Sequence, residues 1–195
     1  MIQKSPFFMQ GSLKASVYYA KEERSLIKAL EYVYAQNEVP LGNSGLALQR
    51  ALKNGVVWND WFYGCPQVQG KVAGKNMLFF DDRVVDVNHL DDHPLLNPSF
   101  LSDHWSEIQV GAMPVSREYL STLVDLSRDV HSGVRALSHK DLGRINASFT
   151  LSEAKDHAYL KAFLGLSEEE RKAYMKEHQA RYGDSIHLWC GLSDA

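Results

Sequence analysis

The run His89-Leu90-Asp91-Asp92-His93 contains the densest group of side chains that could do chemistry. Hard and borderline divalent metals accept imidazole and carboxylate ligands together, and His104 follows in the same loop. The run therefore predicts a metal-dependent hydrolase or nuclease, with His89, Asp91, Asp92 and His93 as acid, base or ligand. Its metal ligands would be His89, Asp91, His93 and His104, and its cofactor a divalent metal. The alternative is a polar turn with solvated histidines, which is favoured because spacing without geometry does not establish a site.

Two known families show a similar pattern over part of this run. His89-x-Asp91 resembles the catalytic loop of small-molecule kinases, but Asn97 stands one residue later than that loop requires. Such a kinase also needs a phosphate-binding loop with a paired lysine, which Gly11 with Lys21 matches poorly. Residues 87–91 with Asn97 resemble the ββα-metal nucleases, but the chain lacks the basic surface and the final metal histidine expected there. Neither resemblance assigns the chain to a family.

The two cysteines, Cys65 and Cys190, lie far apart and form no Cys-x-x-Cys pair. Cys65 stands between Gly64 and Pro66, in a turn that could expose a nucleophilic thiol, although an inert thiol is favoured. Two such cysteines, with no apolar stretch long enough for an export signal or a membrane span, predict free, reduced thiols. We therefore expect an intracellular, cytoplasmic protein.

Aromatic residues are concentrated at Trp58, Trp61, Phe62 and Tyr63. Large rings dominate the energy of an interface when they are exposed and of the core when they are buried. A strand over 56–63 would place Trp58 and Phe62 on one face and Trp61 and Tyr63 on the other. A core role is the first interpretation of such a group, but Trp61 and Tyr63 are predicted to face outward as binding residues.

The hydrophobic pattern predicts an α+β fold: a small antiparallel meander over about residues 56–90, packed with N-terminal and C-terminal helices. The expected strands are 56–63, 67–72, 77–80 and 83–90, with turns at 73–76 and 81–82. The expected helices are 21–36, 44–53, 117–131, one that follows Thr150 and one over 167–182, with caps at Ser44, Ser116, Thr150 and Ser167. The chain is predicted to be one domain over 1–195, with 150–183 as a candidate helical extension.

Composition bears on the choice of partner. The 195 residues are 45% hydrophobic and 23% charged, as in an ordinary folded domain, and the formal net charge is -3. Such a chain has no excess of positive charge for a phosphate backbone, so nucleic acid is not indicated. Because no complete set of catalytic residues can be recognised in the sequence, the preferred hypothesis is a non-catalytic protein-binding module. This adaptor, inhibitor or immunity-type protein would bind another protein through its aromatic-rich sheet, and the metal-dependent enzyme is the alternative.

Overall fold

The computed structural model describes residues 2–4, 8–10, 13–15, 18–20, 25–52, 67–83, 86–109, 115–142 and 147–188. Contacts within the chain divide it into two compact units. The first unit comprises Met1–Leu41 and Val84–Pro114, and the second comprises Gly42–Arg83 and Val115–Ala195. The organisation as a single domain stays a prediction. Within the described residues, no helix combines the length and the apolar character that crossing a membrane requires.

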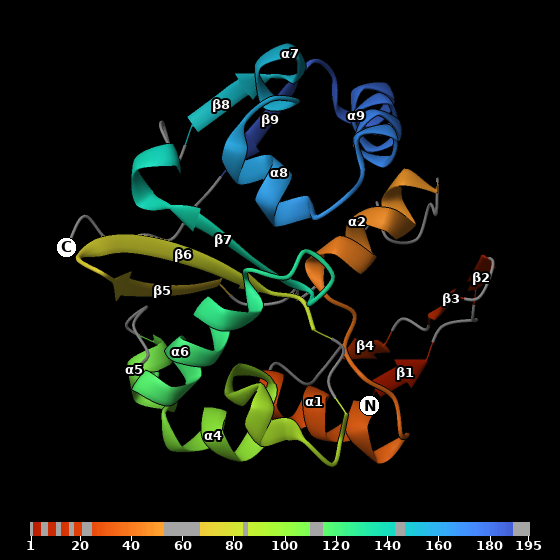
Figure 1. Cartoon of the computed structure of the whole chain (residues 1–195). Helices are drawn as coiled ribbons and strands as arrows, with labels where there is room; N and C mark the ends of the chain where they lie inside the picture. Colours follow the sequence, from red (N-terminus) through yellow and green to blue (C-terminus); the bar gives the residue numbers. More distant parts are fainter. Residues whose placement is uncertain are drawn as a thin grey trace. The chain divides into compact units, whose positions relative to one another are not determined.

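The second unit is built around a three-stranded antiparallel sheet with the order β5 (Gln67–Val72), β6 (Lys75–Asp81) and β7 (Val134–Ser138) (Figure 1). A two-residue turn joins β5 to β6. Ala73 and Gly74 have positive φ angles of 48° and 78°, the combination that a type I′ hairpin turn requires. β6 is the central strand, and its consecutive residues Leu78, Phe79 and Phe80 are each 1% exposed. Both faces of this strand are therefore covered, which explains its continuous apolar run.

Polar caps mark where four helices of the second unit begin. The Ser116 hydroxyl accepts a hydrogen bond from the backbone N–H of Tyr119. Thr150 and Ser167 each form a capping box with the glutamate three residues later. Gly165 ends one helix with a φ of 59°, a left-handed conformation that glycine adopts without strain. These helices are α6 (Arg117–Leu126), α7 (Leu151–Ala154), α8 (Ala158–Leu164) and α9 (Glu168–Tyr182).

Four further elements complete the described part of the second unit. They include an antiparallel strand pair, in which Phe149 lies opposite Ile186. The four are α2 (Asn43–Ala51), η3 (His139–Leu142), β8 (Ala147–Thr150) and β9 (Ser185–Leu188).

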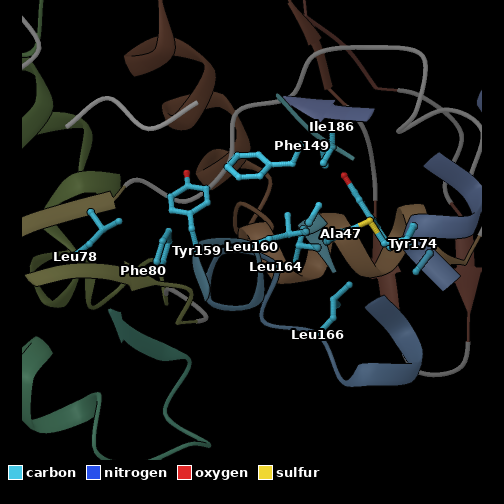
Figure 2. Packing of buried hydrophobic residues seen from close by; sticks show 13 residues of the cluster. Ala47, Leu78, Phe80, Phe149, Tyr159, Leu160, Leu164, Leu166, Tyr174 and Ile186 are labelled. Atoms are coloured by element: carbon cyan, nitrogen blue, oxygen red, sulfur yellow. The ribbon is translucent and has the colours of Figure 1, made fainter. Parts of the chain in front are cut away.

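The hydrophobic core of the second unit lies between the sheet and helices α2, α8 and α9 (Figure 2). Phe80 packs edge to face against Tyr159 and Phe163, with ring centroids 5.7 and 6.0 Å away. Leu160 and Leu164 of α8 are four residues apart, so they lie on one face of the helix, and they are 1% and 2% exposed. The same cluster includes Ala47 of α2, Tyr174 and Met175 of α9, and Phe149 and Ile186 of the β8–β9 pair.

The first unit contains two short antiparallel strand pairs and a group of helices. Tyr34 of the first helix donates a hydrogen bond from its hydroxyl to the Leu96 carbonyl at 2.9 Å. Its buried leucines are Leu30, Leu95, Leu96 and Leu101. β1 (Ile2–Lys4) pairs with β4 (Tyr18–Ala20), and β2 (Phe8–Gln10) pairs with β3 (Leu13–Ala15). The helices are α1 (Leu26–Ala35), η1 (Leu90–Asp92), η2 (Pro94–Leu96), α4 (Pro98–Asp103) and α5 (Trp105–Gln109).

The α+β class predicted from the sequence is confirmed, but the third strand of the sheet comes from another part of the chain. Residues 86–90, expected to be strand, contain a turn followed by the start of η1. β7 pairs with β6 instead, from Met77 opposite Ser138 to Asp81 opposite Val134. Neighbouring strands of a sheet need not be consecutive in sequence, so local patterns do not identify this partner. The strand expected over 56–63 lies outside the described residues.

The predicted cap of the second helix is also corrected. α2 begins at Asn43, and its N-cap is Gly42, which has no capping side chain. Ser44 lies inside the first turn, and its backbone N–H donates to the carboxylate of Asp82 at 2.8 Å. A side chain from the end of β6 therefore satisfies the helix terminus that Ser44 was expected to cap.

Candidate functional site

The run from His89 to His93 lies in the first unit as a series of polar turns. The exposed His89 places its Nδ1 3.2 Å from a carboxylate oxygen of Asp86. That carboxylate also accepts a hydrogen bond from the backbone of Asn88 at 2.9 Å, as in an Asx turn. Asp91 accepts a hydrogen bond from the Asn97 side chain at 3.0 Å. These contacts accord with the polar-turn interpretation of the run.

The residues of the proposed metal set have different surroundings. His93 is buried, at 1% exposed, whereas Asp91 and Asp92 are exposed to solvent. His104 packs on Phe100, with ring centroids 4.4 Å apart, and its Nδ1 lies 3.3 Å from Glu107 Oε2. Among the described residues, which include all the candidate ligands, no three His, Cys, Asp or Glu side chains are grouped so as to hold a metal ion. The catalytic and metal roles predicted for His89, Asp91, Asp92, His93 and His104 thus gain no support from the geometry.

We expect divalent metals to leave the thermal stability of the protein unchanged. A ligand that binds the folded state alone raises the melting temperature by mass action, so a true site would reveal itself. The measurement is the melting temperature with saturating zinc, manganese or magnesium, for the wild type and for the His89→Ala/Asp91→Ala variant. A rise in the wild type that the double variant abolishes would contradict this expectation and restore the metal hypothesis.

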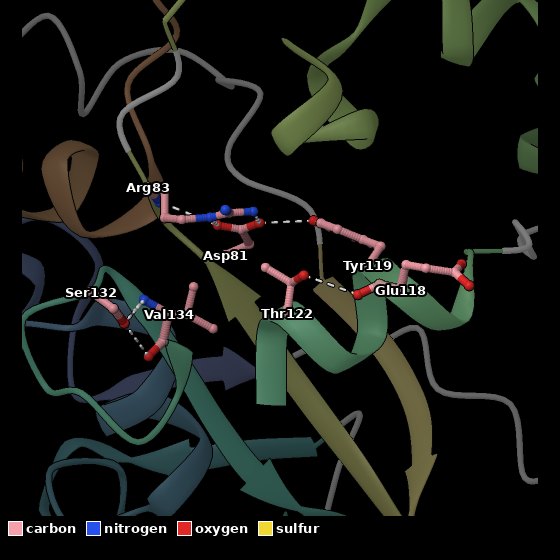
Figure 3. A network of polar contacts seen from close by, with 7 residues as sticks. All are labelled: Asp81, Arg83, Glu118, Tyr119, Thr122, Ser132 and Val134. Carbon is pink, nitrogen blue, oxygen red and sulfur yellow. Dashed lines mark hydrogen bonds and ion pairs between the residues drawn. The ribbon is translucent and has the colours of Figure 1, made fainter. Parts of the chain in front are cut away.

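A buried carboxylate at the end of β6 organises the second unit on the side of α6 (Figure 3). Asp81 is fully buried, and its two oxygens accept hydrogen bonds from Arg83 Nε at 2.8 Å and Arg83 Nη2 at 2.7 Å. The hydroxyl of Tyr119, on α6, donates to the same carboxylate at 2.8 Å. Hydrogen bonding to Asp81 raises the pKa of the Arg83 guanidinium above its ordinary value. The group is a structural ion pair that holds α6 against the sheet.

The next residue, Asp82, points to the other side of the sheet because side chains alternate along an extended chain. Its side chain is 2% exposed and lies 3.2 Å from Arg135 Nη2. The Ser44 hydroxyl also contacts this carboxylate. Arg135 Nε in turn donates to the Ala162 carbonyl at the end of α8. Asp82 and Arg135 therefore connect β6 and β7 with helices α2 and α8.

The sequence predicts a turn at Asp81-Asp82, so it misses both of these carboxylates. A signal was available: two acidic residues follow the apolar run of a central strand and precede Arg83. Charged residues are almost never fully buried unless they are paired, and the pairing arginine stands two residues from Asp81. The second pairing arginine, Arg135, is distant in sequence and leaves no such local signal.

The second unit also has an open hollow of about 510 Å³ among helices α7, α8 and α9. Its apolar lining comes from Leu151 and Met175, and long charged side chains surround them. Lys155 and Lys161 lie 3.9 and 3.8 Å from the carboxylate of Asp156. We call this hollow the basic groove, because cations are the commonest charged residues in its lining. The sequence of α9 is rich in charged residues, but it does not indicate that these charges border a concavity.

We expect His178, on α9, to make the stability of the second unit depend on pH. Burial, with the positive charge of Arg50 as a second cause, lowers the pKa of this histidine below its ordinary value. As the pH falls below about 6.5, the unfolded chain binds a proton that the folded chain resists, so the free energy of unfolding should decrease. Urea titrations at pH 7.5 and 5.5 should show a smaller decrease for His178→Gln than for the wild type. The exposed His131→Gln is the control, and an equal decrease in His178→Gln and the wild type would contradict the prediction.

Several predicted features fall on residues that the structure does not describe. These are the outward-facing aromatic pair Trp61 and Tyr63, and the thiols of Cys65 and Cys190. Their predicted roles stay predictions.

One solved structure is similar to the chain over most of its length. It comes from work on the accommodation of massive sequence variation in Nanoarchaeota by the C-type lectin fold. The similarity covers 88% of this chain and 78% of the other, with a TM-score of 0.66 and 19% sequence identity. At that identity the similarity concerns the fold alone. No family model matches the chain, and no curated protein matches it.

Proposed function

We propose that the chain is a non-catalytic module that binds another protein. The observation that carries the proposal is the fold similarity to a C-type lectin fold that accommodates massive sequence variation. A scaffold that tolerates varied surface residues is suited to recognition, because its stability comes from the core and its specificity from the surface. The described residues add support, since their buried carboxylates are engaged in structural ion pairs.

The binding residues proposed from the sequence are Trp61 and Tyr63. Aromatic anchors supply much of the energy of protein interfaces, and an amphipathic Trp–Tyr pair has the character of such anchors. The experiment compares Trp61→Ala with Trp58→Ala, which is proposed to belong to the core. For each variant, the melting temperature and the affinity for a partner captured from lysate, identified and then purified, are measured.

The two substitutions should separate folding from binding. Trp58→Ala should cost about 3–5 kcal/mol of stability, as expected for loss of a core ring. Trp61→Ala should leave the melting temperature nearly unchanged and weaken partner binding by about tenfold or more. If Trp61→Ala unfolds the protein as severely as Trp58→Ala, the aromatic group is structural. If no stoichiometric complex forms with any purified candidate, the proposed function fails.

We further propose that the protein resides in the cytoplasm with Cys65 and Cys190 reduced. Two widely spaced cysteines are typical of a compartment that keeps thiols free. Thiol titration of the unfolded, non-reduced protein should therefore find two thiols. A result of zero thiols in a monomer would exclude this location and show that the pair is oxidised.

A further inference from the structure

The basic groove concentrates positive charge on a chain that is acidic as a whole. Two carboxylates line it, those of Asp156 and Glu168. Its cations are Lys155, Lys161, Arg171, Lys172 and Lys176. Five cations against two carboxylates leave an excess of three positive charges, whereas the whole chain has a net charge of -3. The rest of the chain therefore carries the acidic excess, and a local excess of positive charge favours an anionic ligand.

Pairing within the groove does not neutralise this excess. Lys155 and Lys161 share the one carboxylate of Asp156, at 3.9 and 3.8 Å. Lys172 binds Glu168 at 2.7 Å, one turn earlier on α9, and this bond lowers the pKa of the Glu168 carboxyl. Lys176 makes no ion pair with any residue that the structure describes. Its ammonium group is exposed and remains available to a ligand.

The lining combines these charges with apolar surface. Leu151 is partly buried and Met175 is 8% exposed, and the two lie in the same hollow as the lysines. Methionine adapts its shape to different apolar groups, because its side chain is unbranched and polarisable. Lysine is a point charge on a flexible stem, so it can follow carboxylates at several positions. A ligand that alternates acidic and apolar groups would therefore be complementary to this surface.

We propose that the basic groove binds an acidic segment of a partner protein, in which carboxylates alternate with apolar side chains. This inference rests on the proposed function as a protein-binding module and gives the chemistry of one partner surface. The carboxylates would contact Lys161 and Lys176, and the apolar side chains would contact Leu151 and Met175. A volume of about 510 Å³ suits several side chains rather than a single small ion.

Other anions fit the groove less well. Single-stranded nucleic acid is held by base stacking on aromatic rings, and no aromatic residue is part of the described lining. A phosphate ion prefers the bidentate fork of arginine. The arginine in the groove, Arg171, already donates from Nη1 to the Leu166 carbonyl at 2.7 Å.

The test measures the affinity of the full chain for a fluorescein-labelled decapeptide of alternating Glu and Leu, by fluorescence anisotropy. The same peptide with Gln in place of Glu should bind about tenfold more weakly or not at all, because the lysines lose their charged partners. Raising the salt concentration from about 0.05 to 0.5 M should lower the affinity of the protein for the acidic peptide, because salt screens the interaction of its carboxylates with the lysines. A thymidine decanucleotide and inorganic phosphate serve as competitors.

A pair of charge-reversed variants assigns the binding to the groove. The Lys161→Glu/Lys176→Glu variant should bind the acidic peptide at least about tenfold more weakly than the wild type. Its melting temperature should change little, because both side chains are exposed. Lys71→Glu/Lys75→Glu changes the net charge equally on the exposed β5–β6 hairpin, and it should leave the affinity within about twofold of the wild type.

Three outcomes would overturn the inference. The first is that the acidic peptide does not bind, and the second is that both charge-reversed variants lose the same affinity for it. The third is that the oligonucleotide or phosphate displaces the labelled peptide at a lower concentration than the unlabelled peptide does. The inference and the proposed function can fail separately. A purified partner that binds both charge-reversed variants as tightly as the wild type would retain the protein-binding function and exclude the groove as its site.

Discussion

Replacement of Asp81 by alanine is expected to lower the free energy of unfolding of the second unit by about 3 kcal/mol. Asp81 accepts both hydrogen bonds of the Arg83 fork and the hydrogen bond of the Tyr119 hydroxyl. Removal of the carboxylate takes the negative charge of Asp81 away from the Arg83 guanidinium, whose side chain is only 19% exposed. It also leaves a phenol hydroxyl without its acceptor inside the unit. Loss of one partner from a buried ion pair costs more than the pair contributes, because the remaining charge stays desolvated.

The matched control for this variant is Asp125→Ala. Asp125 pairs with Arg128 at 2.8 Å, but both side chains are exposed, at 67% and 74%. Its loss should therefore cost at most about 1 kcal/mol. Urea denaturation of both variants measures the difference. The double variant Asp81→Ala/Arg83→Ala should lose less free energy of unfolding than the sum of the losses in the two single variants, because it removes both charges of the pair. Equal effects of Asp81→Ala and Asp125→Ala would show that the Asp81 ion pair is not structural.

Replacement of Phe80 by alanine is expected to cost about 3–5 kcal/mol of stability, through lost burial and the cavity left behind. The ring is 1% exposed on the central strand and packs against Tyr159 and Phe163 of α8. A cavity there would separate the sheet from the helix that covers it (Figure 2). Thermal or urea denaturation of the purified variant measures the loss, and circular dichroism shows whether a folded fraction remains.

Two comparisons make the result interpretable. Val130→Ala removes apolar atoms from a residue that is 88% exposed, so its stability should match the wild type within about 0.5 kcal/mol. Phe80→Leu keeps most of the buried volume and should cost less than Phe80→Ala. If Phe80→Ala is as stable as Val130→Ala, the packing of β6 against α8 does not hold the second unit together.

Features that depend on neighbouring residues could be predicted from the sequence. The caps at Ser116, Thr150 and Ser167 form as expected, because a cap and its backbone partner lie three residues apart. The hairpin expected from strands 67–72 and 77–80 also forms, but its turn is shorter than the predicted 73–76: only Ala73 and Gly74 separate the strands, and the second strand extends over 75–81. Alternating and helical apolar patterns likewise indicated the α+β class.

Features that depend on distant residues could not be predicted in this way. The third strand of the sheet, β7, pairs with β6 across more than fifty intervening residues, and a local pattern does not indicate which strand will pair. The run His89–His93 has suitable side chains for a metal site, yet the 3-10 turns and the burial of His93 place them in unlike environments. Residue type and spacing do not specify the directions of side chains.

The sequence by itself determined the local elements, their caps and the mixed class, because these arise from interactions within a few residues. The tertiary structure decided that Asp81 is a buried structural carboxylate, since its Tyr119 partner is 38 residues away. It likewise decided that Asp82 meets Arg135, 53 residues away. The tertiary structure also decided that lysines of α8 and α9 border one concavity with Leu151 and Met175, because the helices pack together. Local interactions determine the helices, strands and turns, whereas burial and charge pairing between these elements determine which distant side chains come into contact.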